Sequence, residues 1–69
     1  MSTEDYIVRE ARLARLNTGL LNLSEWCKSR AEGQHDQYTT LTMLEKKATE
    51  LKHRVDKAGW DALKDYHAQ

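Results

Sequence analysis

The sequence predicts an all-α protein, an antiparallel two-helix hairpin, and three observations support this prediction. Apolar residues recur every three or four positions in two ladders, the spacing that places side chains on one stripe of an α-helix. The chain has no proline, and a single glycine-containing break separates the ladders. The ladders also mirror each other, because facing residue numbers add up to 67 or 68 if the chain folds back near Gly33. Their members are Leu13, Leu16, Leu20, Leu23 and Cys27, followed by Leu41, Leu44, Ala48, Leu51 and Val55.

The first helix is predicted over residues 3–31 and the second over 37–66, joined by a loop at 32–36. Gly59 lowers the helix propensity of the second segment by about 1 kcal/mol relative to alanine. The apolar spacing nevertheless continues through Gly59. We therefore expect a continuous or slightly kinked helix rather than a break and a short third helix.

The ends of both helices carry capping signals. Ser2 and Asp5 resemble a capping box at the start of the first helix. Asp36 is suited to cap the second helix, since its carboxylate can accept a hydrogen bond from a free backbone N–H. Gly33 is expected to end the first helix in the left-handed conformation.

The chain has 69 residues, which is enough for one domain, 1–69, with a marginal core. Its lone cysteine, Cys27, excludes an internal disulfide, and no Cys/His cluster has the spacing of a zinc site. Oligomerisation is the remaining route to stability. A second apolar stripe on the first helix is expected to pair two copies into a four-helix bundle, or else to dock on an unrelated partner. This stripe consists of Ile7, Ala14 and Leu21.

The charge balance narrows the classes of function. Eleven basic and eleven acidic residues argue against a general polyanion binder and equally against an acidic DNA mimic. No apolar run approaches the ~20 residues that cross a bilayer, and the N-terminus lacks a signal-peptide core. We therefore expect no membrane insertion and a cytoplasmic location. No residue pattern indicates a catalytic, metal or cofactor site.

Basic and aromatic residues outside the ladders are the candidates for binding a partner. Arg and Trp are favoured at protein-binding hot spots, but the same residue types also bind nucleic acid through phosphate contacts and stacking. The balanced charge favours a protein partner. The structural alternatives are a solvated arginine face and tryptophans packed in a dimer interface. The candidates are Arg12, Arg15 and Trp26 in the first helix and Tyr38, His53, Lys57 and Trp60 in the second.

A third hypothesis is an enzyme in which Cys27 is activated by His35. It is disfavoured because an enzyme needs a concave pocket, and two helices rarely enclose one.

The chain as a whole, rather than a short motif, resembles the phage-encoded quorum-sensing anti-activators in length and helical build. The resemblance covers DYIVREARLARLNTGLLNLSEWCKSR and QYTTLTMLEKKATELKHRVDKAGWDALKDYH. It implies an inhibitor in the host cytoplasm that binds the DNA-binding domain of a LuxR-type transcriptional activator and blocks its contact with DNA. It also implies a second target, the ATPase that drives type IV pilus assembly. No functional residues carry over.

The chain also resembles the plasmid RNA-binding regulators of the repressor-of-primer type, which are dimeric helical hairpins. This resemblance implies that basic residues on the outside of the first helix hold a pair of RNA loops. Arg12 and Arg15 are the residues available for that role, although the acidic residues at positions 4, 5, 10 and 25 dilute the patch.

Overall fold

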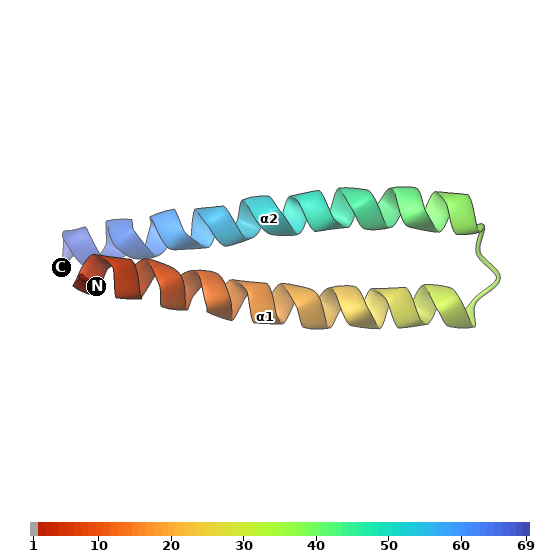
Figure 1. Ribbon diagram of the computed structural model, residues 1–69, viewed down its shortest axis with the longest axis horizontal. Coiled ribbons are helices and arrows are strands. Elements are labelled where there is room, and N and C mark those ends of the chain that lie inside the picture. Colours follow the sequence, from red (N-terminus) through yellow and green to blue (C-terminus); the bar gives the residue numbers. More distant parts are fainter. Residues whose placement is uncertain (1) are drawn as a thin grey trace.

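The computed structural model describes residues 2–69 as two long helices, α1 (Thr3–Glu32) and α2 (Gln37–Ala68). The helices run antiparallel, so that both ends of the chain lie at the same end of the molecule (Figure 1). The molecule is a rod of 50 × 20 × 16 Å. The predicted all-α helical hairpin is therefore confirmed.

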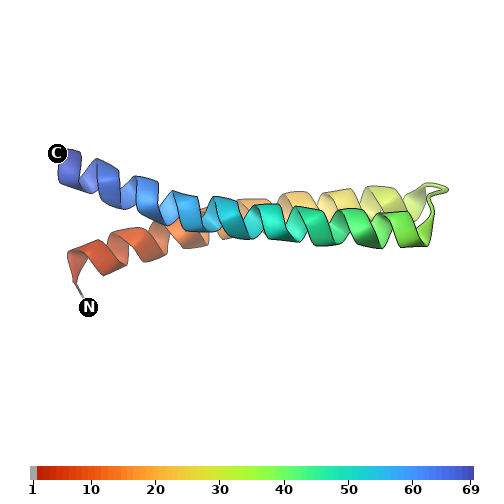
Figure 2. The same cartoon turned by 90° about the horizontal axis from the view of Figure 1, so that it is seen from above.

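The two helices twist around each other. At the loop end the helices are separated in Figure 1 and overlap in Figure 2. At the chain ends they come together in Figure 1 and are separated in Figure 2. α2 runs without interruption through Gly59. In the part of the chain that the structure describes, neither helix has an apolar stretch long enough to span a bilayer.

Side-chain caps fix where both helices begin. Ser2 Oγ accepts a hydrogen bond from the Asp5 backbone N–H at 3.2 Å. Asp36 Oδ2 accepts from the Thr39 backbone N–H and from the Thr39 hydroxyl, both at 2.8 Å. These bonds satisfy amide groups that have no partner inside the helix.

The predicted left-handed end of α1 is wrong. Gly33 has φ −96° and ψ 171°, an extended conformation, and no residue from 2 to 69 has a positive φ. An extended residue carries the chain away from the α1 axis at once. This direction is needed because only residues 33–36 span the gap to α2.

The seam is the set of half-buried residues between the helices, and it differs from the predicted ladders. In the middle of the hairpin it contains Gly19 in place of Leu20, and Lys47 in place of Ala48. Over this stretch the half-buried residues of α1 are Leu16, Gly19, Leu23, Trp26, Cys27 and Arg30, and those of α2 are Thr40, Leu44, Lys47, Leu51 and Val55.

The register also differs from the prediction. Leu51 packs on Gly19 so closely that a β-carbon at residue 19 would overlap with Leu51 Cδ1. The Arg30 guanidinium donates two hydrogen bonds to Thr40 Oγ1, at 3.2 Å from Nε and 3.1 Å from Nη2. The numbers of these facing residues add up to 70, whereas 67 or 68 was predicted. The physical reason is that Gly19 leaves a notch in α1, and the Leu51 side chain fills it.

A consequence of this register is that much of the predicted ladder lies outside the seam. Leu13, Leu20 and Leu41 are 42%, 50% and 55% exposed. Across residues 2–69 no hydrophobic side chain is fully buried, and Gly59 is the one buried residue. The hairpin by itself therefore has a thin core.

Candidate protein-binding groove

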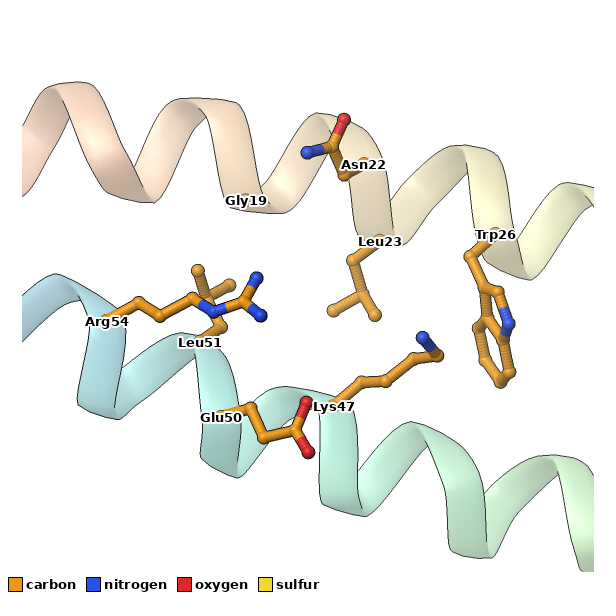
Figure 3. Close-up of a pocket in the computed structure, with 8 residues that line it drawn as sticks. All are labelled: Gly19, Asn22, Leu23, Trp26, Lys47, Glu50, Leu51 and Arg54. Carbon is orange, nitrogen blue, oxygen red and sulfur yellow. The ribbon is translucent and has the colours of Figure 1, made fainter.

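A small groove lies between the two helices at the level of Gly19, with a cavity of about 150 Å³. We call it the Gly19 groove. Figure 3 shows that Leu23 and Leu51 point into the space between the helices and form an apolar floor. Polar and charged side chains surround this floor. The lining residues are Gly19, Asn22, Leu23 and Trp26 from α1 and Lys47, Glu50, Leu51 and Arg54 from α2.

The groove exists because residue 19 has no side chain. A β-carbon there would occupy the space that Leu51 now fills. Gly19 therefore shapes a concave surface in the middle of α1.

The Trp26 ring is held between two cations. The Lys47 ammonium lies 5.1 Å from the ring centroid, and the Arg30 guanidinium carbon lies 5.7 Å from it. Each such contact contributes about 0.5–1 kcal/mol near the surface. Because Arg30 also donates to Thr40 Oγ1, its own position is fixed. The half-buried indole is thus oriented before any partner arrives.

A second cationic cluster continues this surface toward the chain ends. Arg15, Arg54 and Lys57 line a neighbouring depression of about 290 Å³, together with Ala58 and Asp61. Arg54 belongs to both depressions, so they form one continuous surface, which we call the groove face.

Among residues 2–69, no acidic side chain forms an ion pair with the cations of the groove face. Over residues 2–69 the only ion pair joins Glu4 and His67 at 3.3 Å, at the far end of the molecule, and it forms when the imidazole is protonated. Glu50 and Asp61 lie on the groove face but pair with none of its basic residues. The groove face can therefore accept carboxylate or phosphate groups beside an apolar pocket.

The structure brings three of the predicted binding residues together on the groove face, namely Trp26, Arg15 and Lys57. Arg12 lies elsewhere, with its side chain against Gly59, where a β-carbon would be 2.6 Å from Arg12 Nε. Val8 Cγ1 would be 3.1 Å from the same position. Arg12 thus covers Gly59.

The other predicted residues are exposed and more scattered. Tyr38 is 78% exposed at the start of α2, and Trp60 is 66% exposed near its end. His53 and Trp60 are seven residues apart, and Lys57 lies between them, so these three share one side of α2. That side adjoins the groove face through Lys57.

The predicted dimer stripe is uneven in its exposure. Ile7 is half-buried, whereas Ala14 and Leu21 are exposed. Ala14 lines a shallow depression with Arg15 and Asp61.

Sequence reasoning missed four residues of the groove, namely Asn22, Lys47, Glu50 and Arg54. None of the four belongs to the apolar ladders or to the basic and aromatic binding candidates. A signal was present, since Lys47 and Arg54 are seven residues apart and Leu51 lies between them. This spacing places two cations beside an apolar residue on one helix face.

Two findings in the described residues concern metal ligands and the cysteine. From Ser2 to Gln69, no three His, Cys, Asp or Glu side chains are grouped so that they could hold a metal ion. Cys27 is a free, half-buried thiol.

Comparison with known proteins finds no matching family model, and neither a curated protein nor a solved structure with significant similarity to the chain. Any proposal about function must therefore start from the groove face itself.

Proposed function

We propose that this chain is a non-enzymatic protein-binding module whose partner inserts a side chain into the Gly19 groove. The observation that carries the proposal is the oriented Trp26 ring beside an apolar cavity whose neighbouring cations are unpaired. Oriented aromatic rings lose little entropy on binding, and Trp and Arg anchors each contribute about 2 kcal/mol or more at the centre of an interface.

The partner chemistry follows from the size and charge of the groove. A cavity of about 150 Å³ accepts one aliphatic side chain rather than an extended ligand. Lys47 and Arg54 stand beside it and would pair with a carboxylate. The expected partner segment is a helix or loop with a leucine-like residue next to an aspartate or glutamate.

The resemblance to phage-encoded anti-activators supplies a target class, the DNA-binding domain of a LuxR-type activator. DNA-contacting surfaces are basic, so the cationic groove face would not bind there directly. We propose that it binds an acidic patch beside that surface and excludes DNA by steric overlap. The ATPase of type IV pilus assembly is the second target to test in the same way.

Calorimetric titration of a purified LuxR-type DNA-binding domain tests this proposal, with two adjacent lysines as a matched pair. Lys47 lines the groove, and Lys46 is exposed outside it. Lys47→Glu should weaken binding by about tenfold or more, because it places a negative charge against the acidic partner. Lys46→Glu makes the same charge change and should leave the affinity nearly unchanged.

Two results would contradict the proposal. Equal effects of the two lysine variants would show that the groove is not the binding surface. Absence of binding to either the activator domain or the pilus ATPase would reject both target classes, while the groove could still be tested on an acidic amphipathic peptide.

The second candidate function is an RNA-binding regulator, and the grouping of Arg15, Arg54 and Lys57 favours it. Phosphate contacts release counterions, so RNA binding weakens steeply as salt rises. A hairpin RNA titrated at several salt concentrations separates the candidates. A steep slope that Lys57→Gln reduces would support RNA binding, and a flat slope would exclude it.

A further inference from the structure

The flank of the hairpin opposite the groove face carries an apolar surface formed by both helices. Asn22 and Glu50 each precede a seam residue and line the Gly19 groove. In an antiparallel pair, residues that precede the seam positions share one flank, and those that follow share the other. Leu20 follows Gly19, and Ala48 follows Lys47. We call this surface the leucine face; its members are Leu13, Leu20, Leu41 and Ala48, all of them exposed.

The leucine face is unusually open for a monomer. Its three leucines are 42–55% exposed, and no hydrophobic side chain among residues 2–69 is buried. The chain exposes 5704 Å², whereas a compact monomer of 8.0 kDa exposes about 4,500 Å². The excess of about 1,200 Å² belongs to the whole rod of 50 × 20 × 16 Å, and it exceeds the roughly 800 Å² that each partner buries in a standard interface.

We propose that a second copy of this chain covers the leucine face, so that two hairpins stack through it into a four-helix bundle. The surplus area is what a dimer of this size needs. The bordering charges are also self-complementary. Glu45 and Lys52 are both exposed, and the point midway between them lies between Ala48 and Thr49. A two-fold axis beside Ala48 places Glu45 of each copy against Lys52 of the other.

In this arrangement α2 packs against α2 of the second copy, and the small Ala48 lies beside the two-fold axis. The small side chain permits close approach of the two helices. The groove faces then point outward on opposite sides of the dimer, which makes it bivalent toward a partner. The interface does not rest on the proposed function, because no residue of the Gly19 groove takes part in it.

Two adjacent leucines provide the test. Leu20 is 50% exposed on the leucine face, and Leu21 is 61% exposed on the Ile7, Ala14 and Leu21 stripe. Light scattering at micromolar concentration should give twice the 8.0 kDa of the chain. Leu20→Glu should raise the dimer dissociation constant by about 100-fold or more, because the carboxylate is buried without a partner. Leu21→Glu should remain a dimer.

A cross-linking measurement guards against loss of folding in the Leu20 variant. In the Cys27→Ser background, Ala48→Cys should form an interchain disulfide under mild oxidation, because residue 48 lies beside the axis. Ala14→Cys in the same background should not. A monomeric wild-type chain would overturn the proposal. Dissociation by Leu21→Glu alone, or cross-linking through residue 14 alone, would overturn it as well.

Discussion

The two flanks of this hairpin use the same helices for different surfaces. On the groove face, Gly19 opens a cavity, and Trp26 is held by Lys47 and Arg30. On the leucine face, apolar side chains lie open, and Leu20 is half exposed. The groove face is therefore specific in shape and charge, and the leucine face is suited to the burial of apolar surface. Because the two flanks use different residues, a substitution on one flank should leave the properties of the other flank unchanged.

The largest expected effect comes from filling the notch at Gly19. Gly19→Leu should destabilise the chain by about 1–3 kcal/mol, because the added atoms collide with Leu51 and force the helices apart. It should also close the groove to any partner. Thermal unfolding followed by circular dichroism measures the first effect, and calorimetric titration measures the second.

The control for Gly19→Leu is the same residue placed one position earlier. Thr18 is exposed, so Thr18→Leu should leave stability nearly unchanged or raise it slightly through helix propensity. If Gly19→Leu were as stable as Thr18→Leu, the close packing of Leu51 on Gly19 would be wrong. The distinction between the flanks would then lose its structural basis.

A smaller effect on stability is expected from substitution of the two tryptophans. Trp26 is held by neighbouring side chains, whereas Trp60 is exposed. Trp26→Ala should cost about 1–2 kcal/mol of folding free energy, since it removes two cation–π contacts and part of the seam. Trp60 is 66% exposed, and Trp60→Ala should change stability by less than about 0.5 kcal/mol. Urea unfolding of both variants measures the difference. Equal losses would mean that Trp60 is also packed, for example against a second copy.

The hairpin itself could be predicted from sequence because its signals are local. The three- and four-residue spacing, the lack of proline and the capping side chains of Ser2 and Asp36 each act within one or two turns. None of these signals depends on how the helices meet.

The seam and the groove could not be predicted in the same way, because they depend on contacts between the helices. A ladder of large apolar residues selects Leu20, yet the close approach of the helices is set by the missing side chain of Gly19. Lys47 enters the seam because its stem packs between the helices while its ammonium reaches the Trp26 ring. Such contacts between the helices combine small, charged and aromatic residues. The spacing of apolar residues within one helix does not predict them.

The smallest expected effect on stability comes from Asp36, the cap of α2. It is remote from both flanks, so its substitution should leave their properties intact. The Thr39 backbone N–H, and then the Thr39 hydroxyl, lower the pKa of Asp36 below its usual value of 3.8. A lowered pKa in the folded state adds stability above the unfolded pKa, and that stability is lost as the pH falls through the folded pKa.

The melting temperature of the wild type should therefore fall more steeply below pH 3.8 than that of Asp36→Asn, whose amide still caps the helix but cannot titrate. Because the carboxylate is exposed, the stability that it adds should be small; it is fully present at neutral pH and is lost in acid. A melting curve series in acid that is identical for both proteins would show that the cap carries no charge-dependent stability. A change in partner binding at neutral pH would show instead that the loop takes part in recognition.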